Sequence, residues 1–154
     1  MLKSGDIAPN FEMPNADMEV VSLDDYIGKM GLILYFYPKD DTPGCTIESI
    51  DFSDMKDEFK ALGYRVLGIS RDNCESHGKF RDKHGLSIRL LADIDGVMCM
   101  AYDVWRQKEV RGEMREGIMR STFVVDKQGI IRHALYDVKP KGHAAEVMKL
   151  VEAL

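Results

Sequence analysis

Apolar runs and amphipathic segments alternate along this chain of 154 residues. Short runs dominated by apolar side chains and bounded by polar or turn-forming residues predict strands buried in a sheet. These predicted strands are Leu32–Tyr37, Arg65–Ser70, Ile88–Ala92, Ser121–Asp126 and Ile130–Leu135. Segments with helical patterning predict helices over Cys45–Leu62, about Asn73–His84, about Gly96–Tyr102 and from Gly142 to the end. The alternation predicts an α/β fold.

The order of these elements narrows the predicted fold. Strands joined through helices lie parallel in one sheet, with helices on both of its faces. The segment Asp126–Gly129 joins the last two strands directly, which predicts an antiparallel hairpin. We therefore expect a central mixed β-sheet flanked by helices on both faces, in the order of a thioredoxin-like fold.

Cys45 lies at the start of the first predicted helix, shortly after the first predicted strand. The positive end of the helix dipole and the free N–H groups favour an anion there, and the thiolate is the reactive form of cysteine. The helix has an apolar stripe formed by Phe52, Met55, Phe59 and Leu62. Because Cys45 precedes Phe52 by two helical turns, we expect its thiol to face inward with the stripe.

Composition and charge exclude several classes of function. The length suits a single domain over residues 1–154. The net charge is -5 with acidic and basic residues interspersed, so we expect neither nucleic acid nor a membrane as a partner. The N-terminal residues form no apolar signal segment. The chain has three cysteines, an odd number and too few for a disulfide framework. We therefore expect a cytoplasmic protein in a reducing compartment.

Two separated motifs resemble the active-site pattern of the peroxiredoxins. They are Pro38-x-x-x-Thr42-x-x-Cys45-x-x-Glu48 and, far downstream, Arg120-Ser121-Thr122-Phe123. The fuller match is closest to the bacterioferritin-comigratory or Q-type subgroup, and it comprises Asp41–Thr46, Gly68–Asp72 and Ser76-His77. The resemblance starts at Gly5 and covers essentially the whole chain. It implies a thiol-dependent peroxidase without metal or organic cofactor, recycled by a thioredoxin-type or other dithiol donor.

The chemistry of peroxide reduction gives the motif residues their roles. The Cys45 thiolate would attack one peroxide oxygen while the other leaves with the negative charge. Thr42 would donate a hydrogen bond to a peroxide oxygen or accept its proton, and the backbone N–H groups of Gly44 and Cys45 would bind the substrate. Arg120 would stabilise the thiolate and the transition state. The resemblance implies the same roles, with hydrogen peroxide and small organic hydroperoxides as substrates.

Two further motif residues are assigned supporting roles. Pro38 would shield the thiol from bulk water, and Glu48 would orient Arg120 or a neighbouring backbone group. Simpler interpretations exist: Thr42 as a helix cap, and Arg120 as a charge at the edge of a strand. The coincidence of both motifs on the expected elements favours the catalytic interpretation.

Attack on a peroxide leaves Cys45 as a sulfenic acid, which a thiol must resolve. Many members of the subgroup have a second cysteine five residues after the first, but this chain has Ile50; others have it at the position matching Arg81. Cys74 lies on nearly the same helix face as Arg81, and we favour it as the resolving cysteine. Direct attack by an external thiol is supported almost as well. Cys99 lies among apolar residues and is predicted to be packed.

Two other classes of function remain as alternatives on the same expected fold. A thiol-disulfide oxidoreductase needs a second cysteine three residues after the first, where this chain has Glu48. A non-enzymatic holdase would use the same fold with an inert thiol at Cys45. Because no extension follows the last helix, we expect a monomer.

The remaining polar motifs indicate no further site. Cys74, His77 and His84 lack a fourth ligand at suitable spacing, so we expect no metal site, and both histidines are predicted to be solvated. Asp95 is expected near the cap of the next helix. Arg106–Arg120 mixes charges of both signs and predicts a surface loop.

Overall fold

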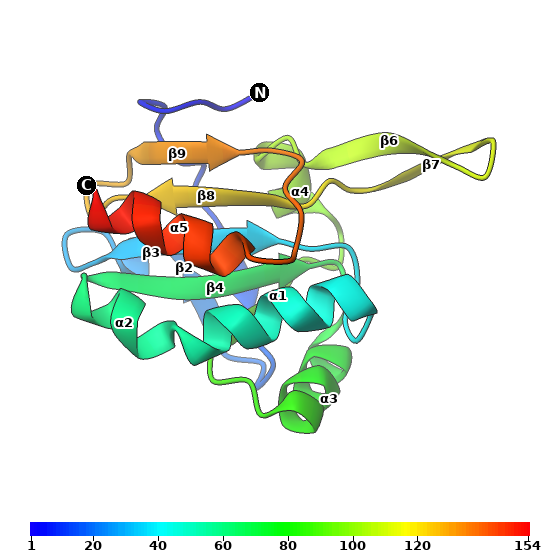
Figure 1. The fold of residues 1–154 in the computed structure, drawn as a ribbon, viewed down its shortest axis with the longest axis horizontal. Helices are drawn as coiled ribbons and strands as arrows, with labels where there is room; N and C mark the ends of the chain where they lie inside the picture. The colour runs from blue at the N-terminus through cyan, green and yellow to red at the C-terminus, as the bar shows by residue number, and fades with distance from the viewer.

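The computed structural model describes residues 1–154 (Figure 1). It is built on a five-stranded sheet in the order β5-β4-β3-β8-β9. Its strands are β3 (Gly31–Phe36), β4 (Tyr64–Ser70), β5 (Arg89–Ala92), β8 (Ser121–Val125) and β9 (Ile131–Leu135). Each lies within one residue of a predicted strand at both ends. Every residue of β3 is buried, as expected for a central strand covered on both faces.

The sheet is mixed, as predicted. β3 and β4 are parallel, and so are β4 and β5. β8 runs antiparallel to both β3 and β9, and a tight turn joins β8 to β9. Gly129 in this turn has a φ of 83°, a conformation that glycine adopts without strain.

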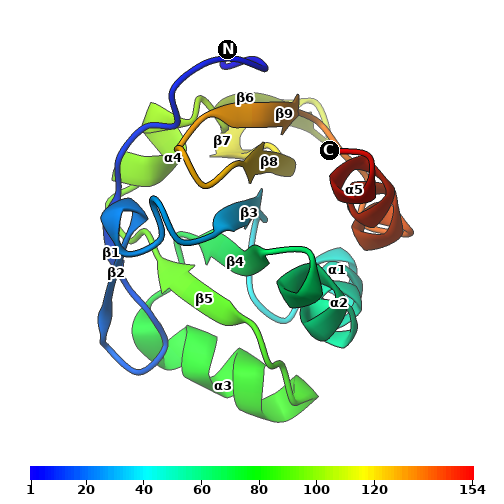
Figure 2. The ribbon, with the colours of Figure 1, turned by 90° about the vertical axis from the view of Figure 1, so that its left-hand side faces the viewer.

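Helices lie on both faces of the sheet (Figure 2). One face carries α1 (Pro43–Asp54), α2 (Lys56–Ala61), α3 (Cys74–His84) and α5 (His143–Glu152). The other face carries α4 (Val97–Ala101) and the short 3-10 helix Leu23–Asp25. None of the helices combines the length and apolar character that crossing a membrane requires.

The alternation of side chains along β3 builds both cores. Tyr35 packs in the cluster below α1 and α5, together with Phe52 and Val147. Its neighbour Phe36 packs in the opposite cluster with Tyr102 of the α4 region. A strand of period two thus supplies both hydrophobic layers.

The predicted helix Cys45–Leu62 is two helices. The break falls at Met55, which is the C-cap of α1 and the N-cap of α2. The apolar stripe therefore does not continue to its predicted end: Phe52 and Phe59 are fully buried, but Leu62 is 44% exposed.

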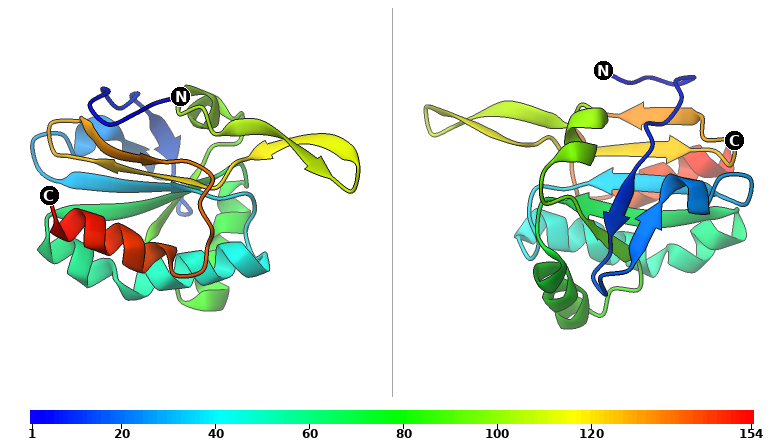
Figure 3. Two further views of the ribbon diagram at one scale, coloured as in Figure 1. Left: turned by 45° about the horizontal axis from the view of Figure 1, so that its top comes forward. Right: turned by 180° about the vertical axis from the view of Figure 1, so that it is seen from behind.

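Two hairpins were not predicted. The first consists of β1 (Glu12–Pro14) and β2 (Val20–Ser22), which are too short to show a periodic pattern. The second consists of β6 (Trp105–Val110) and β7 (Glu113–Ile118), and it extends away from the body of the molecule (Figure 3). The prediction of a surface loop over Arg106–Arg120 is therefore wrong. Most of its residues are exposed on both faces, so no alternation of apolar and polar positions reveals the strands.

A side chain outside α4 accepts hydrogen bonds from the backbone N–H groups at the start of this helix. Asp93, which follows β5, is 1% exposed and accepts hydrogen bonds from the backbone N–H groups of Met98 and Cys99. Asp95 stands next to the N-cap residue Gly96 but is exposed. Asp95 thus lies near the cap, as predicted, but the carboxylate that accepts from the first N–H groups of α4 is that of Asp93.

Candidate active site

Cys45 lies in the first turn of α1, at the edge of the sheet where β3 ends (Figure 1). Thr42 is the N-cap residue, and Pro43 begins the helix, where its missing N–H group costs nothing. Cys45 is 1% exposed and packs in the cluster that contains Tyr35 and Phe52. The prediction that it faces inward with Phe52 is confirmed.

The first turn of α1 places backbone donors beside the thiol. The hydrogen-bond ladder of the helix starts with the bond from Thr46 N–H to Thr42 C=O, at 2.9 Å. The N–H groups of Gly44 and Cys45 precede it and have no acceptor. Gly44 also stands close to its neighbours, since a Cβ there would lie 3.1 Å from Pro140 Cγ and 3.2 Å from Arg120 Nη2. These free donors can bind a polar oxygen.

Arg120 approaches Cys45 because of the sheet topology. β8 is antiparallel to β3 and pairs Ser121 with Phe36, so the residue before β8 lies beside the end of β3. Arg120 Nη2 is 3.4 Å from Cys45 Sγ, and the arginine side chain is 14% exposed. A cation at this distance in a largely dry site stabilises negative charge that develops on or beside the sulfur.

Glu48 holds the other end of the same guanidinium. Arg120 Nη1 donates to Glu48 Oε1 at 2.7 Å, and the glutamate side chain has 0% exposure. Its second oxygen, Oε2, has no hydrogen-bond partner. Burial raises the pKa of Glu48 to about 7, although the positive charge of Arg120 acts in the opposite direction. The 2.7 Å hydrogen bond is the predicted contact between Glu48 and Arg120.

Thr42 is half-buried, and its hydroxyl does not cap the helix. The Oγ1–H group donates instead to the Lys39 carbonyl at 2.8 Å. Since a hydroxyl has a single hydrogen, Thr42 is left with lone pairs that accept a hydrogen bond. Pro38 lies on the same loop and is exposed, so its shielding role stays a prediction.

The other two cysteines occupy different environments. Cys74 is half-buried at the first position of α3, and Asn73 caps this helix by accepting from Ser76 N–H. Cys99 is 0% exposed, and burial together with the Asp93 carboxylate raises the pKa of its thiol far above the ordinary value. The prediction that Cys99 is packed is confirmed.

Lys108 is a cation at this site that the sequence did not reveal. It lies on β6, and its ammonium donates to the carbonyl of Ile118 on β7, two residues before Arg120. Burial lowers the pKa of Lys108, and the charge of Arg120 lowers it further, whereas Asp137 and Cys45 favour the charged form. Lys108 thus adds a second cation on the side of the site where Arg120 lies.

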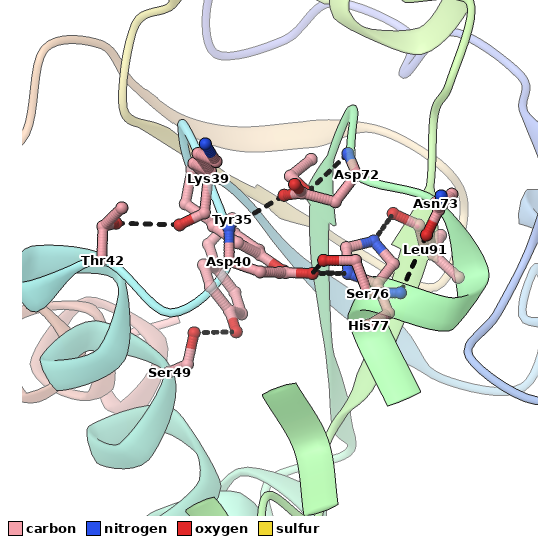
Figure 4. A network of polar contacts seen from close by, with 12 residues as sticks. Tyr35, Lys39, Asp40, Thr42, Ser49, Asp72, Asn73, Ser76, His77 and Leu91 are labelled. Atoms are coloured by element: carbon pink, nitrogen blue, oxygen red, sulfur yellow. Dashed lines mark hydrogen bonds and ion pairs between the residues drawn. The ribbon is translucent and has the colours of Figure 1, made fainter. Parts of the chain in front are cut away.

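The loop between β3 and α1, residues 37–42, leads into Cys45 and is called the Cys45 loop below. A polar cluster next to it contains the only group of side chains with spacing suited to a metal (Figure 4). It consists of Asp40, Asp72 and His77, whose nearest ligand atoms all lie within 4.8 Å of one another. Cys74 and His84, which the sequence analysis weighed with His77 and rejected as metal ligands, are not part of it. Both nitrogens of His77 and both carboxylate oxygens of Asp40 are already in hydrogen bonds, so a metal would have to displace them.

His77 itself is 0% exposed, so the prediction that it is a solvated helix residue is wrong. Groups from the loops after β3 and β4 and from strand β5 surround it, and a helical pattern alone could not reveal them. His84 is one-fifth exposed and pairs with Asp41 at 2.9 Å.

Comparison with known proteins decides the family. The model of the AhpC/TSA family matches residues 4–134. Peroxiredoxin Bcp of Bacillus subtilis is 42% identical over 151 residues, which are 98% of this chain and 96% of the relative. The chain belongs to the peroxiredoxin family. Peroxiredoxin Bcp of Escherichia coli is likewise 43% identical to this peroxiredoxin over 142 residues, 92% of this chain and 90% of the relative.

Solved structures agree with this assignment. A mutant of PrxQ from Xylella fastidiosa has a TM-score of 0.93 and 35% identity, covering 99% of this peroxiredoxin and 97% of that chain. The bacterioferritin comigratory protein of Xanthomonas campestris, described for its alkyl peroxide reduction activity, has a TM-score of 0.88 and 36% identity, covering 93% and 90%. The thioredoxin-like fold and the resemblance to the Bcp and Q-type peroxiredoxins are confirmed.

Proposed function

We propose that this peroxiredoxin reduces hydrogen peroxide and small organic hydroperoxides with Cys45 as the nucleophile. The observation that carries the proposal is the position of Arg120 Nη2, 3.4 Å from Cys45 Sγ, at a helix start with free N–H groups. A sulfur atom held between a fixed cation and unpaired donors is suited to reaction as a thiolate.

The reaction forms a sulfur–oxygen bond and breaks the oxygen–oxygen bond. The Cys45 thiolate attacks the terminal oxygen of the hydroperoxide, which stays on sulfur with its hydrogen as the sulfenic acid. The other oxygen leaves as alkoxide or hydroxide and takes up a proton from water. Thr42 Oγ1 accepts the hydrogen bond of the peroxide O–H group, because its own hydrogen is used on Lys39.

The charge that develops on the leaving oxygen needs donors already in place. The N–H groups of Gly44 and Cys45 and the guanidinium of Arg120 supply them. Glu48 fixes the guanidinium in this position through its 2.7 Å bond. Pro38 limits the access of water to the loop.

Recycling follows one of two routes. Either Cys74 attacks the Cys45 sulfenic acid, forming a disulfide and releasing water, or the thiol of an external donor does so. Support for Cys74 comes from its place beside the Cys45 loop, since Asp40 N–H donates to Asp72 at 2.8 Å, two residues before Cys74. A thioredoxin-type or other dithiol donor reduces the resulting disulfide in both routes.

Peroxide consumption with a dithiol donor tests the proposed function. Wild type and Cys99→Ser should consume peroxide at similar rates, whereas Cys45→Ser should not consume it above background. Retained turnover in Cys45→Ser would refute the assignment of the nucleophile.

The route of recycling is tested on protein treated with one equivalent of peroxide. A Cys45–Cys74 disulfide, mapped by mass spectrometry and absent from Cys74→Ser, supports the internal route. A Cys45 sulfenic acid that persists beside a free Cys74 thiol indicates the external donor.

We extend the proposal to the location, partners, cofactors and oligomeric state of the enzyme. The net charge of -5 supports an enzyme that binds neither nucleic acid nor anionic membranes. A cytoplasmic location and the absence of a metal or organic cofactor stay predictions. Residues 1–154 form one domain around the single central sheet. The monomeric state stays a prediction, which light scattering would test.

A further inference from the structure

Asp40 lies in the loop between β3 and α1, and its carboxylate is buried among hydrogen-bond donors (Figure 4). Oδ1 accepts from the Tyr37 hydroxyl at 2.6 Å. Oδ2 accepts from the Ser76 hydroxyl at 2.8 Å and lies 2.7 Å from His77 Nδ1. One side chain of the Cys45 loop thus contacts two consecutive residues of α3.

The backbone of Asp40 makes a further contact. Its N–H group donates to Asp72 Oδ2 at 2.8 Å, and the same oxygen accepts from the Ser70 hydroxyl at 2.6 Å. The loop after β3 is therefore attached to the loop after β4 as well as to α3. Thr42 and the start of α1 follow directly after this attachment point.

The contact between His77 and Asp40 needs a proton. His77 Nε2 lies 2.8 Å from the Leu91 carbonyl, which can only accept, so Nε2 carries a hydrogen. Nδ1 faces a carboxylate oxygen at 2.7 Å, and two acceptors at this distance would repel each other. A second hydrogen therefore lies between Nδ1 and Oδ2, on either residue.

The groups in direct contact with His77 include no cation, and the nearest lysines of α3, Lys79 and Lys83, line a pocket on the other side of Asp40 and Ser76. The loop after β3 supplies Asp40, and the loop after β4 supplies Asp72. β5 supplies only the Leu91 carbonyl. The Tyr37 hydroxyl at 3.4 Å is neutral, since burial raises its pKa well above the ordinary value. Loss of the shared proton would leave the Asp40 carboxylate facing a bare nitrogen.

We propose that Asp40 and His77 form a proton-dependent clamp that positions the Cys45 loop for peroxide reduction. The clamp acts through Thr42 and the first turn of α1, which must stand at fixed distances from the peroxide. This inference rests on the proposed function. It assigns Asp40 and His77 as positioning residues, because neither touches the sulfur.

Asp40→Asn tests the clamp because it inverts the proton requirement. An asparagine amide donates to the bare Nδ1 of a neutral His77, while Nε2 still donates to Leu91. The contact is lost with rising pH in the wild type, where a proton leaves, and with falling pH in the variant, where His77 becomes charged. A merely structural role would change both proteins in the same direction.

The measurement separates loop position from thiol ionisation. The rate constant for single-turnover oxidation of Cys45 by hydrogen peroxide is divided by that for its alkylation by iodoacetamide at the same pH. This ratio should fall about tenfold with rising pH in the wild type. In Asp40→Asn it should fall about as much with falling pH. Profiles that overlap would overturn the proposal.

Two further variants complete the test. His77→Gln has no titrating ring nitrogen, so its ratio of peroxide oxidation to alkylation should not change with pH. If this ratio falls with rising pH as in the wild type, the clamp is refuted. This outcome decides even if Asp40→Asn fails to fold. His133→Gln is the matched control, since His133 lies on β9 and makes no side-chain hydrogen bond. It should keep the wild-type profile; loss of the slope there would show that the profile does not arise from the clamp.

Nitrogen chemical shifts of the His77 ring give an answer without any substitution. They should change over the pH range in which the wild-type ratio falls, and constant shifts throughout would overturn the proposal. Failure of the proposed function is distinct from this result. In that case wild-type Cys45 would not react with peroxide at any pH.

Discussion

At the scale of single residues, Glu48 shows how burial and charge oppose each other. It is fully buried, holds Arg120 through one oxygen, and has no partner for the other. Such a pair contributes little net stability, because removing both charges from water costs about as much as their attraction returns. Its effect is geometric: it leaves Arg120 Nη2 directed at Cys45.

Glu48→Gln should change how stability depends on pH. The pKa of Glu48 rises from its ordinary 4.5 to about 7 in the folded protein, so the folded state keeps a proton that the unfolded chain loses between these values. The free energy of unfolding of the wild type should therefore fall by about 3 kcal/mol relative to the variant as the pH rises through this window. Urea unfolding at several pH values measures it; a pH-independent difference would contradict the prediction.

Arg120→Met should lower the rate constant of peroxide reduction about 100-fold, because it removes the fixed cation from the developing charge. Arg120→Lys should be intermediate, since an ammonium keeps the charge but cannot contact Glu48 and Cys45 with two separate nitrogens. Stopped-flow oxidation by hydrogen peroxide measures both. Arg115→Met on exposed β7 is the control, and an unchanged rate in Arg120→Met would remove the arginine from the mechanism.

At the scale of elements, the strands of the central sheet could be predicted from the sequence because they are buried on both faces. β3 shows this most clearly, with an unbroken apolar run from Leu32 to Tyr37. The break at Met55 could not be predicted, because the apolar stripe continues across it. The β6–β7 hairpin was missed for the opposite reason, since exposed strands need no apolar face.

The β6–β7 hairpin should be the first part of the molecule to be cut by trypsin. Its two strands pair only with each other, and its turn contains the exposed Arg111. Local opening there breaks few contacts, so the cost of exposing the backbone is small. Limited digestion followed by mass spectrometry should find the first cleavage after Arg111. Initial cleavage within α1 or α3 would contradict this.

At the scale of the whole molecule, the site exists because three parallel strands and one antiparallel strand meet at one edge. Cys45 and Arg120 are 75 residues apart in sequence and touch only because β8 runs back along β3. The resemblance to the peroxiredoxin motifs identifies Cys45 and Arg120 as site residues from the sequence alone. The contact of Arg120 with Glu48 was one of two roles that the sequence suggested for Glu48. The distances among Cys45, Arg120 and Glu48 required the folded chain, since spacing in sequence carries no distance between elements.

The burial of His77 belongs to the same scale. A helical pattern shows which face of α3 a residue occupies, but His77 is covered by groups from the loops after β3 and β4 and by Leu91 of β5. Likewise, Lys108 reaches the site from a hairpin whose existence the sequence did not indicate. Local sequence patterns could not predict the environment of a residue that is surrounded by segments distant in sequence.

Mapping of the sulfenic acid tests most directly whether Cys45 is the thiol that reduces peroxide. The Cys74→Ser protein, in which an internal disulfide with Cys74 cannot hide the product, is treated with one equivalent of hydrogen peroxide and dimedone and analysed by peptide mass spectrometry. We predict a dimedone adduct on Cys45, none on Cys99, and no peroxide-dependent adduct once Cys45 is also replaced by serine. An adduct on Cys99 with unmodified Cys45, or undiminished oxidation without Cys45, would contradict the assignment.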